Sequence, residues 1–347
     1  MSNHWFTKVI IITLLFFSNC AKKENSFLTN EEKKAKVLDE VQIIQIPLAG
    51  DVSIRKSEIS GLCWYNDNLI LLPQYPDRFP DKNGGKIFYI SKEKIKAYLS
   101  GKNISALEAE YFSINVNDFP DLFSIGSGFE SVTINNNIAY FTIESASNLK
   151  TETYLISGLI DPVGKTIQLN QESLRKVQSE INIKNFSDES ILLYNDKLYP
   201  IYEANGSNIN PNSSVAVFDI SMNYLNEIKF PNIEYRITDV TSVDENNKFW
   251  AINYFFPREA GKLSPANDNI ANKFGIGKSH LDSKVVERLI QLQISNDEIT
   301  LTEEAPIYIK LLKDDSRNWE GIARLDEDGF LIVTDMFPET ILAFVKN

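Results

Sequence analysis

A short unit recurs along this chain, and the repetition sharply narrows the folds that the chain can adopt. Each copy begins with an acidic residue and continues with an apolar run, a polar turn and a second apolar run. The five opening acids are Glu58, Glu130, Glu189, Asp239 and Glu320. The turns are rich in Asn and Asp, as at residues 66–68 and 135–137, which is typical of tight connections between antiparallel strands. A unit this small cannot bury both of its faces alone, so the copies are expected to pack against one another.

Two further β-rich runs follow each copy, and after the first copy they cover residues 86–90 and 110–114. Four strands per copy predict antiparallel blades around an axis, which is the architecture of an all-β protein of the β-propeller class. Five blades is the direct count, and six are possible if the long step before the last copy contains a degenerate one. The last copy lacks a fourth strand, so residues 41–48, a β-rich run with no copy of their own, are expected to supply it and close the ring. Short helices are expected between copies, at residues 92–99 and 172–181.

The first residues of the chain are predicted to be a secretion signal. An apolar run at residues 9–17 is too short to span a membrane, and Cys20 follows it in a segment that resembles a lipobox. Residues 1–19 would then be a lipoprotein signal peptide, residues 20–38 a lipidated cysteine with a charged tether, and residues 39–347 a single propeller domain. An uncleaved anchor with a chance cysteine is the alternative. The prediction is a monomer held on the cell envelope, at the outer membrane or the periplasmic face, through lipid on Cys20.

Charge and the scarcity of histidine exclude several kinds of function. The net charge of −12 argues against a nucleic-acid partner, which needs clustered Lys and Arg. His4 lies in the predicted signal, so neither a histidine-rich zinc site nor a Ser-His-Asp triad is expected in the mature chain. His280 is expected to be an exposed loop residue, with a role as general base as the alternative. Cys63 is expected to be a small buried side chain, and no other cysteine of the mature chain could form a disulfide with it.

The opening acids are expected to converge at one site. In a four-stranded blade, the turn that enters the first strand and the turn that leaves the second strand lie on the same face of a propeller. The residues that end the second strands are also acids or amides: Gln74, Glu144, Glu203, Asn253 and Asp335. Two rings of oxygen atoms should therefore face a funnel over the axis, and such oxygens suit a divalent cation, most simply Ca²⁺. The predicted metal ligands are Glu58, Glu130, Glu144, Glu189, Glu203, Asp239, Asn253, Glu320 and Asp335. The alternative is that each acid binds backbone amides of its own turn.

Arginines near the opening acids are predicted to balance their charge or to bind an anionic substrate group. Arg55, Arg236 and Arg317 each lie three residues before an opening acid, and Arg78 lies in a loop on the same face. A long insertion at residues 255–284 is expected to hang over that face as a lid or specificity loop, or to be a loop with no such role.

Several of these segments resemble the phytase-like β-propeller family, which is named for the esterase-like activity of phytase. The similar segments are residues 59–62 (Ile-Ser-Gly-Leu), 128–132 (Gly-Phe-Glu-Ser-Val), 236–240 (Arg-Ile-Thr-Asp-Val), 319–323 (Trp-Glu-Gly-Ile-Ala) and 329–335 (Gly-Phe-Leu-Ile-Val-Thr-Asp). The similarity spans roughly residues 40–346, and a wider resemblance extends to regucalcin-like and paraoxonase-like calcium-dependent propellers. Ser131 and Gln74 depart from the family pattern, in which a glycine and an acid are common at these positions.

The resemblance and the acid rings together predict a function. The chain is expected to be a cell-envelope lipoprotein that binds a divalent cation in the funnel and hydrolyses a phosphoester or carboxyl ester of a small molecule. Glu130, Asp239 and Glu320 are the predicted catalytic residues. A non-catalytic propeller that binds a protein or a glycan is the alternative, and a purely structural metal is a third interpretation.

Overall fold

The computed structural model describes residues 36–116, 119, 127–146, 150–179, 181–312 and 316–347. The predicted signal peptide and the lipidation site Cys20 lie outside the described residues. Within the described ranges, no helix is both long enough and apolar enough to cross a bilayer.

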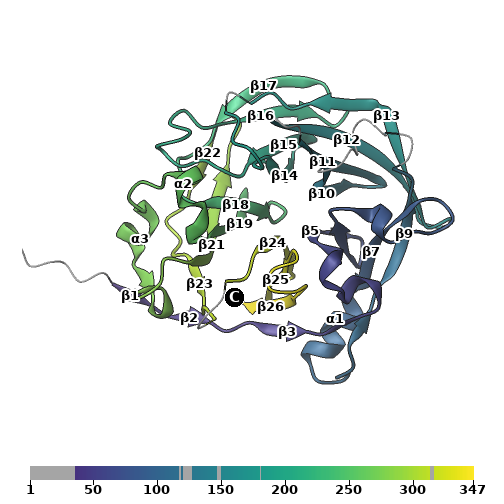
Figure 1. Ribbon diagram of the computed structural model, residues 1–347, viewed down its shortest axis with the longest axis horizontal. Coiled ribbons are helices and arrows are strands. Elements are labelled where there is room, and N and C mark those ends of the chain that lie inside the picture. The colour runs from purple at the N-terminus through teal and green to yellow at the C-terminus, as the bar shows by residue number, and fades with distance from the viewer. Residues whose placement is uncertain (1–35, 117–118, 120–126, 147–149, 180, 313–315) are drawn as a thin grey trace, which may run out of the picture. The chain divides into compact units, whose positions relative to one another are not determined.

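The strands sort into four-stranded antiparallel units that follow one another along the chain (Figure 1). Unit 1 consists of β5 (Ile59–Tyr65), β6 (Asn68–Pro73), β7 (Gly85–Ser91) and β9 (Glu110–Ile114). Unit 2 consists of β10 (Gly128–Asn135), β11 (Ile138–Ala146), β12 (Thr151–Asp161) and β13 (Thr166–Lys176). Unit 3 consists of β14 (Asp188–Tyr194), β15 (Lys197–Tyr202), β16 (Ser214–Asp219) and β17 (Tyr224–Lys229). Unit 4 consists of β18 (Arg236–Val240), β19 (Lys248–Phe255), β21 (Val286–Ile294) and β23 (Ile307–Ile309), with β22 (Ile299–Leu301) also paired to β21. Unit 5 consists of β24 (Trp319–Leu325), β25 (Gly329–Thr334), β26 (Leu342–Lys346) and β3 (Ile44–Ile46).

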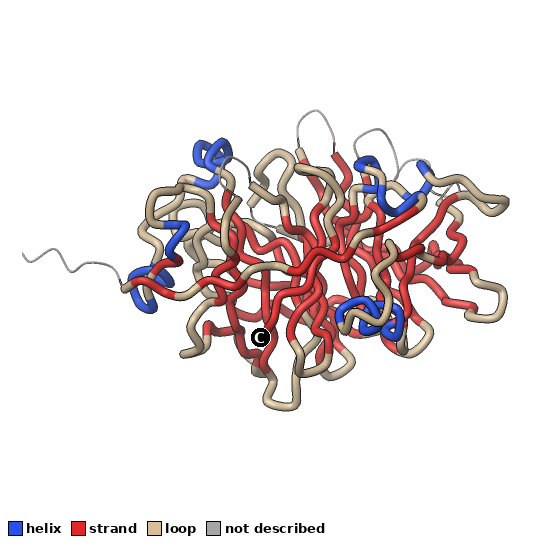
Figure 2. The backbone as a smooth tube through the Cα atoms, turned by 90° about the horizontal axis from the view of Figure 1, so that it is seen from below, coloured by secondary structure: helices blue, strands red, loops and turns tan. Residues whose placement is uncertain are grey.

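The first strands of the units contact one another in a closed ring. β5 contacts β10, β10 contacts β14, β14 contacts β18, β18 contacts β24, and β24 contacts β5. Figure 1 shows the other strands of each unit placed outward from this ring, and Figure 2 shows strands running between two faces formed by loops. The described chain is therefore a β-propeller of four-stranded units, which confirms the predicted fold class.

The N-terminal strands form a belt, residues 37–49, along the outer edges of three units and the insertion in unit 4. β1 (Val37–Leu38) pairs with β20 (Ile276–Gly277), β2 (Glu40–Val41) with β23, β3 with β26, and β4 (Leu48–Ala49) with β8 (Leu107–Glu108). Because β3 pairs with β26 in antiparallel register, with Ile46 opposite Leu342, it is the fourth strand of unit 5. The expectation that the N-terminal run closes the ring is confirmed.

The closing strand offers a test of how much its inward face contributes to stability. Ile46 is 1% exposed and packs in the apolar cluster between units 1 and 5, whereas Ile44 on the same strand is 50% exposed. Ile46→Ala should lower the free energy of unfolding by about 2–4 kcal/mol, the usual cost of truncating a buried isoleucine. The matched variant Ile44→Ala should change it by less than about 0.5 kcal/mol. Urea denaturation measures both values, and equal losses would show that the closing strand does not seal a core.

Neighbouring units enclose apolar clusters of their own. Between units 1 and 5, Leu62 and Leu71 pack with Val333 and Leu342, and the fully buried Trp319 belongs to the cluster between units 4 and 5. β6 is buried along almost its whole length, whereas the outer strand β17 is mostly exposed. The core is thus distributed around the ring, as a repeat that cannot bury itself requires.

The first turns of the units use left-handed backbone at the predicted polar positions. Asn66, Asn136, Asn195, Asn247 and Asp326 have φ angles between 48° and 60°. Asn and Asp tolerate this conformation better than other residues with a side chain, which explains the composition of these turns.

Helices are short and lie between strands. α1 (Lys92–Leu99), capped by Ser91, confirms one predicted helix. The other prediction, at residues 172–181, is wrong in its described part, because β13 extends to Lys176, where Arg175 and Lys176 pair with Leu155 and Tyr154 of β12, and strand pairing overrides local helix propensity. The remaining helical turns are η1 (Asp51–Ser53), η2 (Arg55–Ser57), η3 (Pro76–Arg78), η4 (Pro257–Glu259), α2 (Ala260–Leu263), α3 (Asn269–Phe274) and η5 (Lys278–His280).

Candidate functional site

In each unit the first two strands lose register at the start of the first strand. The residues that fall at this shift are Ser60, Glu130, Glu189 and Glu320 in units 1, 2, 3 and 5, and Thr238 with Asp239 in unit 4. Such bulges re-aim a side chain, so these residues occupy equivalent positions around the axis. Glu58 lies two residues before the shifted position of its unit, and Asp239 lies at the second residue of a two-residue shift.

Arg236 is the centre of an axial cluster of acids. It is the first paired residue of β18, opposite Tyr254, and lies one residue before Ile237, as Glu58 lies one residue before Ile59 in unit 1. Its Nη2 is 2.8 Å from both carboxylate oxygens of Glu189 and 3.4 Å from Glu320 Oε1, and its Nε donates to Glu203. The Arg236 side chain is only 8% exposed. One buried guanidinium therefore joins carboxylates from units 3 and 5 to unit 4.

Glu189 and Glu203 also interact directly. They share a hydrogen bond, which requires a proton on one of the two carboxyl groups. Burial raises the pKa of Glu203 to about 7, although the charge of Arg236 acts in the opposite direction. Burial raises the pKa of Glu189 well above its ordinary range as well. Burial therefore favours a proton on this pair, while the guanidinium beside it favours the ionised form.

Glu130 lies on the side of the cluster formed by units 1 and 2. Its Oε1 accepts a hydrogen bond from Gln74 Nε2 at 2.8 Å, so this partner is uncharged. Burial, together with the negative charges of Glu144 and Glu189, raises the pKa of Glu130 well above its ordinary range. Burial also raises the pKa of Glu144. Burial therefore favours the protonated form of the Glu130 carboxyl group.

Glu58 and Arg78 form the more open rim of the cluster. Arg78 Nη1 is 2.6 Å from Glu58 Oε1, and the Arg78 guanidinium lies 3.9 Å from the centre of the Tyr75 ring. Burial raises the pKa of Tyr75 to about 12, with contributions from the charges of Glu130 and Glu58. Because the Arg78 side chain is 39% exposed, it can reach a group that enters from solvent.

Glu320 and Asp335 complete the cluster from unit 5. Asn318 Nδ2 donates to Glu320 Oε1 at 2.5 Å, and Asn318 Oδ1 accepts from Arg236 Nη1 at 3.4 Å. Burial raises the pKa of Glu320 well above its ordinary range, and the charge of Asp335 adds to this effect. Burial raises the pKa of Asp335 too.

Asp239 binds backbone amides of three units. Its Oδ2 accepts from Ile322 N at 2.8 Å and from Leu62 N at 3.4 Å, and its Oδ1 accepts from Val240 N at 2.8 Å. Burial raises its pKa well above the ordinary range. At this position the alternative prediction, an acid bound to backbone donors, describes the geometry, although the donors come from units 1 and 5 as well as from unit 4.

Three predicted site residues are engaged outside the cluster. Asn253 Oδ1 accepts from Arg288 Nε at 2.8 Å, and the register places Tyr254, not Asn253, opposite Arg236. Arg317 is buried with its Nη2 2.7 Å from Glu287. Arg55 is exposed and donates to the Met336 carbonyl at 2.7 Å.

Two expectations about lone residues are wrong. His280 is 2% exposed, because its Nδ1 lies 2.9 Å from Glu40 Oε1 and its Nε2 accepts from Glu287 N. The insertion that carries it is held against the N-terminal belt, which the sequence alone could not reveal. Cys63 is only partly buried, because its strand position places it beside the axis.

A divalent cation does not fit the cluster as it is arranged. Among the residues that the structure describes, no group of three or more His, Cys, Asp or Glu side chains could hold a metal ion. The physical reason is Arg236, which already donates to oxygens of Glu189, Glu203 and Glu320. Calcium binding therefore stays a prediction from the sequence.

Sequence reasoning missed three residues of the site. Tyr254 lies with its ring centre 6.0 Å from the Arg236 guanidinium carbon, Glu259 Oε1 lies 3.7 Å from Arg236 Nη1, and Asn318 bridges Arg236 and Glu320. Tyr254 and Asn318 could have been found by aligning the strands of the units residue by residue. Glu259 belongs to the insertion, so no repeat signal marks it.

Comparisons with known proteins concern the fold alone. A scan against protein-family models finds no match, and no curated protein matches the sequence. Solved structures similar to this chain include a candidate glycoside hydrolase from Bacteroides ovatus, with 9% identity over 88% of this chain and 96% of that one and a TM-score of 0.47. An α-L-arabinanase mutant from Cellvibrio cellulosa has 7% identity, coverage of 88% and 91%, and a TM-score of 0.45. The catalytic domain of a GH62 α-L-arabinofuranosidase from Coprinopsis cinerea has 8% identity, coverage of 89% and 98%, and a TM-score of 0.44. Similarities this distant give no information about the chemistry of this site.

Proposed function

We propose that the axial cluster is the active centre of a hydrolase that acts on a phosphoester or a carboxyl ester. The observation that carries the proposal is the convergence of buried carboxyl groups from units 3 and 5 on the single guanidinium of Arg236. Carboxyl groups with strongly raised pKa values, gathered in one place, are typical of acid–base catalysis. The resemblance of the strand segments to the phytase-like family supports ester chemistry.

The hydrogen-bond partners of each residue suggest its catalytic role in this proposal. Glu130, which is hydrogen-bonded to an amide and whose protonated form is favoured by burial, would be the general acid that protonates the leaving oxygen. Glu320 receives donors from Arg236 and Asn318, which oppose the effect of burial on its pKa, so of the two carboxyl groups it would be the base that takes a proton from the attacking water. Arg78 on the rim would bind a negatively charged part of the substrate. Asp239, predicted as catalytic, would instead hold the first strands together.

No step of this proposal depends on a cation, and calcium binding in the funnel stays a separate prediction from the sequence. We further propose that the chain acts on the cell envelope, anchored by lipid at Cys20. The support for this location is the apolar run at residues 9–17 followed by Cys20.

A substrate panel with the full chain tests the function. Aryl phosphate monoesters and diesters, aryl carboxyl esters and aryl glycosides are incubated with the purified protein, with and without EDTA. The expected result is turnover of one of the ester classes that survives EDTA. Loss of turnover in EDTA would instead support the calcium prediction from the sequence. Absence of turnover in every class would contradict the hydrolase proposal and favour the alternative of a non-catalytic binding propeller.

A further inference from the structure

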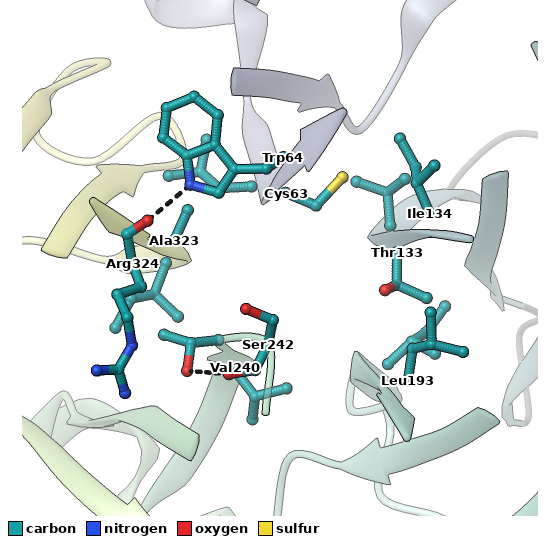
Figure 3. Close-up of a pocket in the computed structure, with 14 residues that line it drawn as sticks. Cys63, Trp64, Thr133, Ile134, Leu193, Val240, Ser242, Ala323 and Arg324 are labelled. Carbon is teal, nitrogen blue, oxygen red and sulfur yellow. Dashed lines mark hydrogen bonds between the residues drawn. The ribbon is translucent and has the colours of Figure 1, made fainter. Parts of the chain in front are cut away.

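A cavity lies on the axis, on the other side of Asp239 from the acid cluster. Its volume is about 130 Å³, and residues at or just after the first strands of all the units line it (Figure 3). Trp64, Ala323 and Arg324 lie along one side of the cavity, and Thr133 and Leu193 along the opposite side (Figure 3). Along each first strand, the residues that line the cavity come after the carboxyl residue near the start of that strand. The carboxylate of Asp239, which is bound to Leu62 N and Ile322 N, lies between the two sites.

Arg324 is the charged group of this cavity. Its Nε and Nη2 atoms are buried and have no hydrogen-bond partner among the residues that the structure describes. The carboxylate paired with it, Asp244, has its Oδ2 3.9 Å from Nη2, which is beyond hydrogen-bond distance. The Arg324 carbonyl accepts from Trp64 Nε1 at 2.7 Å, which fixes the backbone of this residue at the cavity wall. Buried donors on a guanidinium are costly to leave unpaired, so a ligand that accepts from them gains affinity.

The shape and lining of the cavity restrict that ligand. Two adjacent N–H groups of a guanidinium match the two oxygens of a carboxylate. The partly exposed apolar side chains in the rest of the wall are Cys63, Trp64, Ile134 and Leu193. The volume leaves space for only a few heavy atoms beyond the carboxylate. We propose that this cavity binds a small monocarboxylate with a short aliphatic tail, with the carboxylate on Arg324 and the tail against Ile134 and Leu193.

Isothermal titration calorimetry, which measures the binding of butyrate to the full chain, tests the proposal. Butyrate should bind more tightly than acetate, which lacks most of the tail, and more tightly than butyramide, which lacks the charge. Arg324→Met should weaken butyrate binding by at least about tenfold, the effect of losing charge-assisted hydrogen bonds. The matched control is Lys92→Met, because Lys92 lies 4.7 Å from the Trp64 ring but does not line the cavity. This control should stay within about twofold of the unchanged protein.

A second variant keeps Arg324 and removes the space. Thr133→Phe places a ring in the cavity and should abolish butyrate binding even if Arg324→Met folds poorly. Three results would overturn the proposal: no binding of butyrate, equal binding by butyramide, or tighter binding of inorganic phosphate than of butyrate. The acid cluster is untouched in these variants, so the outcome does not depend on the proposed hydrolase activity.

Discussion

Arg236→Met is expected to lower the free energy of unfolding by about 3–5 kcal/mol near neutral pH, the usual cost of breaking a buried ion pair from one side. The guanidinium is the positive charge that contacts Glu189, Glu203 and Glu320, and methionine fills a similar volume without replacing it. The buried carboxylates would then either lose stabilisation or take up protons.

The expected pH dependence of the Arg236→Met variant follows from the sign of the pKa shifts. The charge of Arg236 lowers the pKa values of Glu189, Glu203 and Glu320, so its removal raises folded-state values that burial has already raised. A carboxyl group whose pKa is higher in the folded state loses stability as pH rises from its unfolded value, about 4.3 for Glu, through its folded value. The deficit of the variant should therefore be small near pH 4 and grow toward pH 8. Urea denaturation at several pH values measures it.

The matched control for Arg236→Met is Arg55→Met. Arg55 also lies three residues before an opening acid, but it is exposed, so its replacement should cost less than about 1 kcal/mol at every pH.

Added Ca²⁺ should raise the melting temperature of Arg236→Met, in which the carboxylates are free to take a cation, but not that of the unchanged protein. A rise in the unchanged protein would contradict the interpretation of Arg236 as the resident positive charge.

The double variant Glu130→Gln with Glu320→Gln is expected to reduce kcat/KM for the ester substrate by at least about 10²–10⁴-fold, the usual contribution of one acid–base residue. Glutamine keeps the size of each side chain but can neither donate the acid proton nor accept a proton from water. Burial raises the pKa values of both residues, so an uncharged amide removes a cost of ionisation above neutral pH. The free energy of unfolding of the double variant should therefore be unchanged or higher at pH 8, and lost activity could not be attributed to unfolding.

The matched control for this double variant changes two exposed acids, Glu93→Gln with Glu245→Gln. It should retain activity within about twofold, because surface charges far from a site are largely screened. Steady-state kinetics on the substrate found in the panel, with urea denaturation of both double variants, makes the comparison. Equal activity in the Glu130/Glu320 variant and in the unchanged protein would remove the axial cluster from the mechanism.

The sequence revealed the repeat, the turns and the closing strand, because those features are local. Apolar runs, Asn-rich turns and the unpaired run at residues 41–48 each depend on residues close together in the chain. The radial position of each acid was harder to predict, because it depends on a one- or two-residue register shift that apolar patterning does not mark. For this reason the spacing in sequence groups Glu58 and Asp239 with Glu130, although Glu58 lies two residues before the shift of its unit and Asp239 lies at the second residue of a two-residue shift.

The roles of the arginines depend on contacts between units and could not be predicted from spacing. Arg55, Arg236 and Arg317 share the same distance from an opening acid, yet only Arg236 contacts the acid cluster in the described structure. Arg317 binds Glu287 of unit 4, and Arg55 remains at the surface. Their equal spacing in sequence predicts the same role for all three arginines. The bulges and the contacts with neighbouring units determine where each guanidinium lies.

The N-terminal belt has a consequence for the order of folding. Ile46 pairs with Leu342, so β3, which is synthesised early, cannot pair until β26 near the C-terminus has been synthesised. Until then the nascent propeller is an open arc with bare strand edges, which are prone to pair with other chains. Ring closure is thus a step that follows translation, and a chaperone that shields edges would act on this protein before that step.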